Sequence, residues 1–416
     1  MNIGIIGFGH IGNVMAACLL EDGHALSCMD SNPAVMAAIA RGKITISERG
    51  VAERLKAGHA EGRLTPAYTP HDLSAADMIF CCVGSPSAPC GGFDASHVIA
   101  AARTCGEAAR LRARDLPPLL LVFRSTILPG TVETMILPVL IEVTGETPGT
   151  TYDVATNPEF LREGTAIADY RAPSRIVIGE RVRGSADRLA ELYRHITAPV
   201  FRTSLAAAEM VKYADNAFHA LKASFANEIG RYCRASGIAP GEVMDMFLAD
   251  HVLNVSAAYL RPGAPFGGPC LPKDVAALAG GMEALSVRAP VIASILPSNA
   301  AHADYLFAQV AERAPSPARV FLIGLAFKPE TTDLAESPAV RMAQRLLQEG
   351  YQLSIYDPEI ARAAHTRIPL PENLKALLRT TVPAPPGIDV AIAMQPSPLI
   401  AALAEAGVPV LDFHRL

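Results

Sequence analysis

The stretch NIGIIGFGHIG, residues 2–12, decides the fold of this chain. Its first part, Asn2–Gly7, is apolar almost throughout, which predicts a buried strand. Three glycines follow and open a segment with helical spacing, and a second apolar run, Ala25–Asp30, ends in an acid. Strand, glycine turn, helix and acid-terminated strand in this order form the dinucleotide-binding fingerprint of a doubly wound α/β domain.

The fingerprint residues predict NAD as the cofactor. Gly7 permits the tight turn, Gly9 lets the backbone approach a pyrophosphate, and Gly12 allows close packing of the helix on the strand. Asp30 can accept hydrogen bonds from a ribose diol and would repel a 2′-phosphate, which favours NAD over NADP. The alternative is a glycine turn that binds no nucleotide, but the whole fingerprint is present. The candidate cofactor contacts are Gly7, Gly9, Ile11, Gly12, Asp30, Val83, Ser85, Ser125 and Thr126.

Composition and charge exclude several classes of function. Half of the residues are apolar and 19% are charged, which is typical of a globular protein. The net charge of -5 and the lack of basic runs give no support to nucleic-acid binding. No apolar stretch is long enough to span a membrane, and no charged segment precedes the first apolar run, so we expect a cytoplasmic protein.

The eight cysteines and eleven histidines indicate neither a disulfide framework nor a metal site. Disulfides remain an alternative for an even number of cysteines, but reduced thiols are favoured in a large chain without a secretion signal. No CxxC or HExxH spacing occurs, and the histidines are scattered. We therefore expect no metal.

Alternating apolar runs and amphipathic segments predict a doubly wound parallel sheet in the first half of the chain. The expected strands are Asn2–Gly7, Ala25–Asp30, Met78–Val83, Leu119–Arg124, Asp153–Thr156 and Ile176–Gly179. A second α/β module is expected from Arg319 onward. Its strands are Val320–Gly324, Leu353–Asp357, Asp389–Met394 and Val408–Phe413, with a helix over Pro338–Gly350.

A long helix connects the two predicted modules. Leu205–Ser236 contains no proline and ends before Gly237 and Pro240, which are helix-stop signals. The fold class is therefore two Rossmann-like doubly wound domains joined by a helical central domain with a spine helix. The expected boundaries are residues 1–200, 201–300 and 315–416, with the prolines at 315 and 317 in the second linker.

The loop FGGPCLPKD, residues 266–274, places Cys270 beside Lys273 and Asp274. A nearby cation lowers the pKa of a thiol and favours the reactive thiolate. A buried structural cysteine in a turn is the alternative, and the local residues leave both open.

The spine helix carries a polar stripe. Lys212, Asn216 and His219 lie at i, i+4 and i+7, and Asn227 falls near the same face. The stripe could be the solvated side of the helix. Its amides also suit the recognition of hydroxyl groups, so a binding site is the second interpretation.

Several motifs together resemble the nucleotide-sugar 6-dehydrogenases, the family of UDP-glucose and GDP-mannose dehydrogenases. The resemblance covers the chain to about residue 360, and FANEIG and DHVLNVSAAYLRPG look most like the GDP-mannose branch. The matching stretches are GFGHIG at 7–12, CCVGSP at 81–86, RSTILPGT at 124–131, NPEFLREGTAI at 157–167, KYADNAFHALKASFANEIG at 212–230, FGGPCLPKDV at 266–275 and GLAFKPETTDLAESP at 324–338.

The resemblance implies a four-electron oxidation of a primary alcohol to a uronate by two successive hydride transfers to NAD. Cys270 would form a thiohemiacetal and then a thioester. Lys212 and Asn216 would stabilise oxyanion character. Asp274, with a water near Thr126, would serve proton transfer in the alcohol step.

The same resemblance implies the remaining site residues. Glu159 would direct water at the thioester. The expected substrate contacts are Glu163, Lys212, Asn216, His219, Asn227, Tyr259, Arg261, Gly267, Lys273 and Lys328. In this family Arg261 can come from the neighbouring subunit, which implies a homodimer joined through the central helices.

Several positions depart from the GDP-mannose branch. Pro269 replaces a serine before the cysteine, Val35 and Ala335 replace basic residues, and Ala258 and Ala264 replace larger aromatics. The last module is also short. These changes leave three hypotheses: an active enzyme making a uronate such as GDP-mannuronate, an enzyme on the same frame with another substrate, and a non-catalytic nucleotide-binding homologue.

Overall fold

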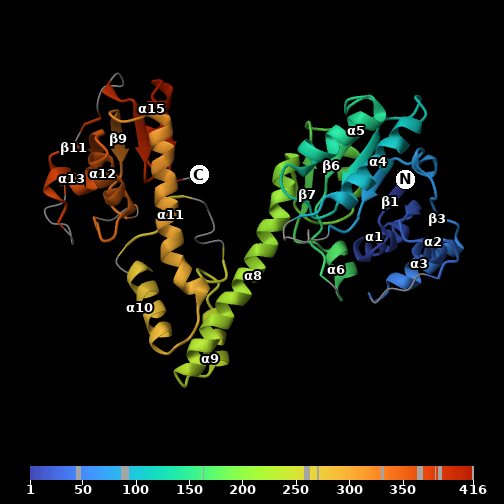
Figure 1. Cartoon of the computed structure of the whole chain (residues 1–416), viewed down its shortest axis with the longest axis horizontal. Helices are drawn as coiled ribbons and strands as arrows, with labels where there is room; N and C mark the ends of the chain where they lie inside the picture. The colour runs from blue at the N-terminus through green and yellow to red at the C-terminus, as the bar shows by residue number, and fades with distance from the viewer. Residues whose placement is uncertain are drawn as a thin grey trace. The chain divides into compact units, whose positions relative to one another are not determined.

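The chain consists of two compact units, Met1–His219 and Ala220–Leu416. The computed structural model describes residues 1–43, 48–85, 93–162, 164–256, 263–268, 271–327, 329, 332–362, 369–379, 381–382 and 387–414, and their side chains except those of residues 223, 224, 273, 274 and 277. Figure 1 labels the helices and strands of both units.

The first unit is built on an eight-stranded sheet in the order β3-β2-β1-β4-β5-β6-β7-β8. Neighbouring strands are parallel except β6 and β7, which are antiparallel. The strands are β1 Asn2–Ile6, β2 Ala25–Met29, β3 Leu64–Pro66, β4 Met78–Cys81, β5 Leu119–Phe123, β6 Tyr152–Thr156, β7 Ile176–Glu180 and β8 Val200–Thr203.

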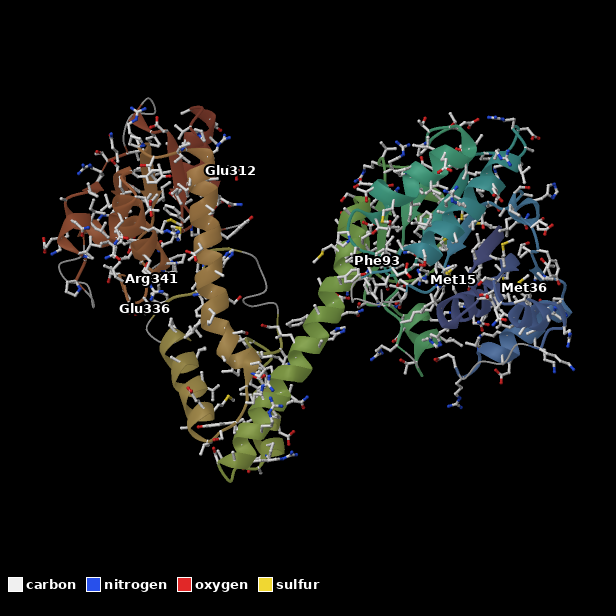
Figure 2. The ribbon with its side chains drawn as sticks, in the orientation of Figure 1. Met15, Met36, Phe93, Glu312, Glu336 and Arg341 are labelled. Atoms are coloured by element: carbon white, nitrogen blue, oxygen red, sulfur yellow. The ribbon has the colours of Figure 1, made fainter. Side chains whose placement is uncertain are left out.

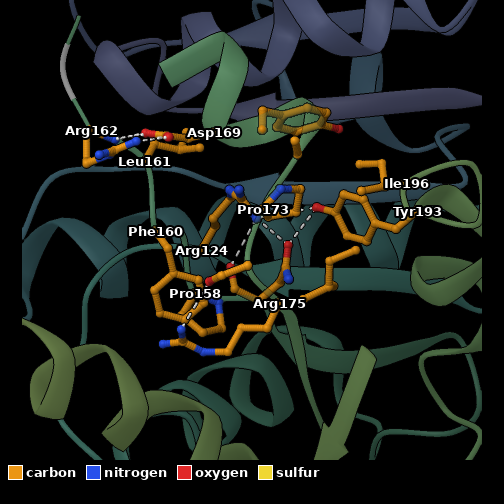
Figure 3. A pocket seen from close by; sticks show the side chains of 15 residues that line it. Arg124, Pro158, Phe160, Leu161, Arg162, Asp169, Pro173, Arg175, Tyr193 and Ile196 are labelled. Atoms are coloured by element: carbon orange, nitrogen blue, oxygen red, sulfur yellow. Dashed lines mark hydrogen bonds and ion pairs between the residues drawn. The ribbon is translucent and has the colours of Figure 1, made fainter. Parts of the chain in front are cut away.

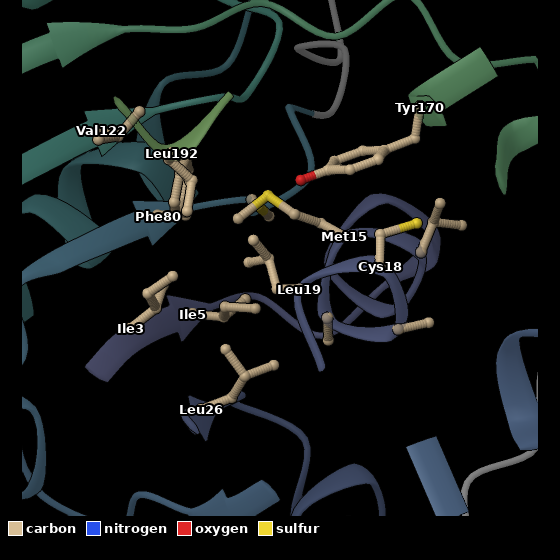
Figure 4. Packing of buried hydrophobic residues seen from close by; sticks show 14 of the residues in the cluster. Ile3, Ile5, Met15, Cys18, Leu19, Leu26, Phe80, Val122, Tyr170 and Leu192 are labelled. Carbon is tan, nitrogen blue, oxygen red and sulfur yellow. The ribbon is translucent and has the colours of Figure 1, made fainter. Parts of the chain in front are cut away.

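Both faces of this sheet are buried, because successive strand residues point to opposite sides. Phe80 and Val122 pack in one cluster with residues of helix α1, whereas Ile79 and Leu121 pack in another cluster with helix α4. Figure 4 shows the first cluster, in which Met15 of α1 lies among the strand side chains. The α-helices of this unit are α1 His10–Glu21, α2 Pro33–Ala40, α3 Val51–Ala60, α4 Ser96–Leu111, α5 Leu137–Thr144, α6 Ala166–Arg171 and α7 Asp187–Leu192.

A long helix, α8, begins in the first unit and continues into the second. It spans Leu205–Ala235 and is followed by α9 Pro240–Leu248, α10 Leu271–Ala284 and α11 Pro290–Arg313. Glu228 of α8 is buried, and its two carboxylate oxygens accept the N–H groups of Val291 and Ile292, both at 2.9 Å. These donors are left free by the helix itself in the first turn of α11, so the bonds fix α11 on α8.

The second unit ends in a five-stranded parallel sheet in the order β11-β10-β9-β12-β13. Its strands are β9 Arg319–Ile323, β10 Gln352–Tyr356, β11 Leu378–Arg379, β12 Val390–Ala393 and β13 Val410–Asp412. Its helices are α12 Pro338–Gln348, α13 Pro358–Arg362, α14 Glu372–Lys375 and α15 Leu399–Glu405. Separate apolar clusters cover its two faces, one with α11 and α12 and the other with α15.

The predicted fold class is confirmed by these two sheets and the helices between them. The strands expected from apolar runs and the helix over Leu205–Ser236 all occur, with ends that differ by one or two residues. Two features differ from the prediction. The strand β7 is antiparallel to β6, and the sheets extend to the edge strands β3, β8 and β11, which no apolar run indicated.

The attachment of α8 to the first unit yields a stability prediction. Glu209 is 2% exposed, accepts the N–H of Val132 at 2.9 Å and also accepts the N–H of Gly130. Burial raises the pKa of its carboxyl group. Glu209→Ala leaves both donors without an acceptor and should lower the free energy of unfolding by about 1–3 kcal/mol. Urea unfolding followed by circular dichroism measures the change.

The matched control is Glu133→Ala, which removes an exposed carboxylate from the same turn and should shift stability by less than about 0.5 kcal/mol. Equal urea midpoints for the two variants would contradict the role assigned to Glu209.

Candidate functional site

The glycine turn between β1 and α1 leaves open space above its middle residue. Gly7 has a φ of +92°, and a Cβ atom there would lie 2.7 Å from the backbone nitrogen of Val83. A Cβ atom on Gly12 would lie 2.1 Å from the carbonyl oxygen of Gly7. At Gly9, by contrast, an added Cβ would meet no heavy atom within 4 Å. The turn is therefore closely packed at Gly7 and Gly12, whereas the space next to Gly9, at the N-terminus of α1, is open.

The carboxylate of Asp30 is held by backbone donors just after β2. One oxygen accepts the N–H of Phe8 at 2.7 Å, and the other accepts the N–H of Asn32 at 2.8 Å. Asp30 is half-buried, so its oxygens keep lone pairs that face solvent. The hydrogen bond from Phe8 also connects Asp30 to the glycine turn.

A hollow with a volume of ≈ 540 Å³ opens over the glycine turn and Asp30. It is lined by Ile6, Gly7, Gly9, Met29, Asp30, Ser31, Met36, Ala67, Tyr68, Cys82, Val83, Gly84, His97, Ala100, Ala101 and Thr104. Four predicted cofactor contacts are thus brought together, namely Gly7, Gly9, Asp30 and Val83. Tyr68, His97 and Thr104 lie in segments without a motif, so the sequence did not point to them.

The other predicted cofactor contacts are not among the residues that line this hollow. Gly12 packs closely against the carbonyl oxygen of Gly7, and Ile11 packs partly against the apolar core. Ser125 donates from its hydroxyl to the carbonyl oxygen of Val83 at 2.6 Å and so joins the ends of β4 and β5. Thr126 and Ser85 are half-buried.

Lys212 of α8 and Glu159, after β6, form an ion pair. The distance from Nζ to Oε1 is 2.8 Å, and the two side chains are 12% and 11% exposed. The second carboxylate oxygen of Glu159 accepts the N–H of Leu161 at 2.7 Å. Lys212 also lies over the ring of Phe160, with Nζ 5.8 Å from the centroid. A cation and a carboxylate are therefore held together with little access to water.

The surroundings of this pair include contacts that the sequence did not predict. Arg175 stacks over the ring of Phe160 at 4.3 Å and pairs with Asp215, which lies on α8 three residues after Lys212. Asn216 and His219 are exposed on α8, one and two turns beyond Lys212. Asn227 is exposed on the part of α8 that belongs to the second unit.

A buried polar network holds the chain at the end of β6, just before Glu159. Arg124 donates to the carbonyl oxygen of Asn157 at 3.3 Å and also to its side-chain oxygen, which accepts the hydroxyl of Tyr193 at 2.7 Å. Burial raises the pKa of Tyr193, so its hydroxyl keeps the proton that it donates. Figure 3 shows Arg124 and Tyr193 in a cavity of ≈ 320 Å³ that Phe160 and Arg175 also line. The network fixes the backbone that leads to Glu159.

In the second unit, the described part of the cysteine loop is tightly packed. A Cβ atom on Gly267 would lie 2.4 Å from the carbonyl oxygen of Glu336. Ala264 packs partly against the core of the C-terminal sheet, and Ala335 is buried. Val35 packs partly against the core of the first unit. These small or apolar residues are thus integrated into packing where the family resemblance led us to expect basic or aromatic side chains.

Comparison with known proteins identifies the whole arrangement. Residues 1–197 match the NAD binding domain of the UDP-glucose/GDP-mannose dehydrogenase family, residues 206–301 its central domain and residues 321–404 its UDP binding domain. The chain belongs to the UDP-glucose/GDP-mannose dehydrogenase family.

Individual members of this family cover most of the chain. It is 42% identical to the GDP-mannose 6-dehydrogenase of Pseudomonas putida over 364 residues, which is 87% of this chain and 82% of that protein. It is 33% identical to a UDP-glucose 6-dehydrogenase of Haloferax volcanii over 375 residues, 89% of this chain and 86% of that protein. The solved ternary complex of GDP-mannose dehydrogenase from Pseudomonas aeruginosa superimposes with a TM-score of 0.92 at 37% identity and covers 99% of this chain and 96% of that chain.

Membership of this dehydrogenase family confirms three predictions: the resemblance itself, the enzyme class and NAD as the cofactor. The observed site fits that cofactor, because the turn is open above Gly9, the helix N-terminus faces that space and Asp30 offers a carboxylate. Among the described residues, no helix is long and apolar enough to cross a membrane, and no cluster of three His, Cys, Asp or Glu could hold a metal ion.

Several predicted site residues lie outside the described residues. They are Cys270, Glu163, Tyr259, Arg261 and Lys328, together with the side chains of Lys273 and Asp274. The six cysteines among the described residues are free and buried, and burial raises the pKa of Cys18 and Cys82 to about 12. Thiols with such pKa values are poor nucleophiles at neutral pH.

The position of Asp30 predicts how this dehydrogenase chooses its cofactor. Asp30→Asn keeps the shape of the side chain and removes its charge, so it should raise the Kd for NAD about tenfold and reduce the preference over NADP. Titration calorimetry with both nucleotides measures the two constants. Ser31→Ala, in the same hollow, should leave both within about threefold, and an unchanged NAD to NADP ratio in Asp30→Asn would contradict the assignment.

Proposed function

We propose that this enzyme oxidises the C6 primary alcohol of GDP-mannose to a carboxylate and so forms GDP-mannuronate. The identity of 40–42% to proteins named GDP-mannose 6-dehydrogenase supports the substrate. The observation that carries the chemistry is the shielded pair of Lys212 and Glu159, next to the carboxyl ends of the strands of an NAD-binding domain. NAD, when bound, supplies the hydride acceptor.

The alcohol step requires a cation near the reacting oxygen and a route for the proton. Lys212 supplies this cation, and the neutral amide of Asn216 adds a hydrogen-bond donor to an oxygen that gains negative charge. Asp274, with a water near Thr126, takes the proton of the hydroxyl group. The shielding of Lys212 strengthens its electrostatic effect on a substrate that excludes water.

Covalent capture by Cys270 divides the second oxidation into balanced steps. The thiolate adds to the aldehyde carbon, the carbonyl oxygen takes a proton, and a thiohemiacetal results. That carbon then loses a hydride, which a second NAD would accept, and its hydroxyl oxygen loses a proton, so that a thioester results. Water then attacks the thioester and gives one proton to Glu159, and the carbon–sulfur bond breaks. The carboxylate product leaves, and the sulfur of Cys270 takes the other proton.

Glu159 is the base for that last attack. Its one oxygen is held by the N–H of Leu161 and the other by Lys212, so the carboxylate is oriented before substrate arrives. A carboxylate held in this way can take a proton from a water placed at the thioester. Lys212 therefore has two roles, as an oxyanion partner and as the group that orients Glu159.

The substrate contacts and the domain limits are part of the same proposal. The remaining contacts are Glu163, His219, Asn227, Tyr259, Arg261, Gly267, Lys273 and Lys328. The functional domains are residues 1–200 for NAD, 201–300 for the catalytic helices and 315–416 for the nucleotide end of the substrate.

We also propose a cytoplasmic homodimer that joins through the central helices. A group of large apolar side chains in the second unit is exposed, including Met246 at 65% and Val252 at 79%. Leu248, Leu253 and Val255 belong to the same group. Apolar exposure on this scale is typical of a protein–protein interface. Arg261 from the partner would then complete the site.

A second candidate substrate is a UDP-hexose. The family model for residues 321–404 is described as a UDP binding domain, and relatives at 33% identity are UDP-glucose 6-dehydrogenases. Both candidates use the same chemistry at C6.

NADH absorbance during turnover tests the reaction and the substrate. Purified enzyme should form about two NADH per GDP-mannose consumed, because the oxidation removes four electrons. Cys270→Ala should form no uronate, whereas Cys233→Ala, at a buried cysteine of the same unit, should keep activity. Faster oxidation of UDP-glucose than of GDP-mannose would overturn the substrate, and uronate formation by Cys270→Ala would overturn the thioester route.

Mass spectrometry of the intact protein tests the role of Glu159. Glu159→Gln keeps the hydrogen-bonding shape but cannot take a proton, so hydrolysis should slow by about 10²–10⁴-fold and the acyl-enzyme should accumulate. The protein mass should rise by one uronyl nucleotide residue during turnover. Glu142→Gln, at an exposed ion pair with Arg103, should show no adduct. An adduct-free Glu159→Gln protein with a low rate would exclude Glu159 as the hydrolytic base.

A further inference from the structure

The six residues before Pro269, Gly263–Gly268, are held by two side chains of helix α11. We call them the pre-cysteine segment, because Cys270 follows two residues later. Asn299 accepts the N–H of Phe266 through Oδ1 at 2.9 Å and donates from Nδ2 to the carbonyl oxygen of Phe266 at 2.9 Å. One amide side chain thus satisfies both backbone groups of one loop residue, as a neighbouring strand would.

A second side chain of α11 holds the start of the segment. His302 lies three residues after Asn299 and therefore on the same face of the helix. Its Nε2 lies 2.7 Å from the carbonyl oxygen of Gly263 and donates to it. The two side chains fix Gly263 and Phe266 to one rigid helix.

On its other side, the segment meets the turn before α12. Gly268 donates its N–H to the carbonyl oxygen of Ala335 at 3.1 Å. Gly268 has a φ of +88°, and a Cβ atom there would lie 2.8 Å from the ring of Phe327. Glu336, labelled beside Arg341 in Figure 2, presents its carbonyl oxygen to Gly267. The segment therefore has no room to shift toward this turn.

Asparagine is a poor residue for the interior of a helix, because its amide competes with the backbone for hydrogen bonds. Here both polar ends of the Asn299 amide are used on Phe266, outside the helix. The hydrogen bonds of the amide therefore stabilise the loop and not the helix that carries Asn299. Its partner residue stands four positions before the proposed nucleophile.

We propose that Asn299 is a positioning residue for the nucleophile loop, setting the backbone from which Cys270 reaches the substrate. This inference rests on the proposed role of Cys270. A displacement of about 1 Å in a reacting group can lower a rate about 10²-fold, so the loss of two bonds at Phe266 acts on turnover without touching substrate.

The test compares Asn299→Leu and Asn299→Asp with the control Ser298→Ala, an exposed neighbour on the same helix. The alkylation rate of Cys270 by iodoacetamide, quantified on the peptide that contains it, reports the state of the thiol without any turnover. Steady-state kinetics with GDP-mannose give kcat and KM separately. The Kd for NAD and the thermal midpoint report whether the protein is folded.

We expect Asn299→Leu to lower kcat about 10–100-fold with KM within about threefold, and to change the alkylation rate of Cys270 at least about threefold. NAD affinity should stay at the wild-type value, because NAD binds to the first unit. Asn299→Asp keeps the acceptor and loses the donor, so its kcat should lie between Asn299→Leu and wild type. This variant also serves if Asn299→Leu does not fold.

A wild-type kcat in both variants would overturn the proposal, and so would a lost kcat with an unchanged alkylation rate. Failure of the proposed function is distinguishable, because Cys270→Ala would then stay active while the alkylation rates still report on Asn299.

Discussion

The hydrogen bonds of Asn157 hold the part of the first sheet on which the candidate site depends. Its backbone N–H donates to Phe123 at 2.9 Å, and its side-chain amide donates to Val177 at 2.8 Å, so one residue joins β5, β6 and β7. Its side-chain oxygen accepts from Arg124 and Tyr193. Because Asn157 is 2% exposed, each of these bonds is shielded from water and would be costly to lose. Glu159 lies two residues after Asn157, so the same hydrogen bonds restrict the backbone that carries its carboxylate.

The helices that surround the sheet are attached by the same physical device. Buried carboxylates accept the free N–H groups at helix starts: Glu48 at α6, Glu209 at the turn before α5 and Glu228 at α11. Each carboxylate comes from a distant part of the sequence, so the cap is also a tertiary contact. Two of the three lie on α8, one in each unit. The long helix is thus anchored at both of its parts by charge and hydrogen bonding as well as by apolar packing.

The sequence predicted the structural features that depend on local patterns of residues. It did not predict the contacts between residues that are far apart in the chain. The strands of the sheet centre, the glycine turn and Asp30 follow from runs of apolar residues and one motif, whose geometry is set within about thirty residues. The edge strands β3, β8 and β11 are short and half-exposed, so no apolar run marks them. The contacts of Arg175 with Asp215 and of Asn299 with Phe266 join residues far apart in the chain, and no spacing in a single sequence reveals such pairs.

Both sheets carry the same local arrangement of a glycine with positive φ and an aspartate, but the burial of the aspartate differs between them. Gly7 and Gly324 both have positive φ, and Asp30 and Asp357 both accept an N–H from the residues that follow those glycines. In the first unit, Asp30 is half-buried and lines the hollow over the glycine turn. Asp357 is 4% exposed, and its other oxygen accepts two N–H groups at the start of α13.

That difference separates the functions of the two sheets. A carboxylate whose lone pairs are occupied by backbone donors cannot also accept hydrogen bonds from a ribose diol. The second sheet therefore keeps the fold of a dinucleotide-binding domain without its acidic recognition group. This agrees with a chain in which only the first domain matches an NAD binding domain, and the last matches a nucleotide-binding domain of another kind.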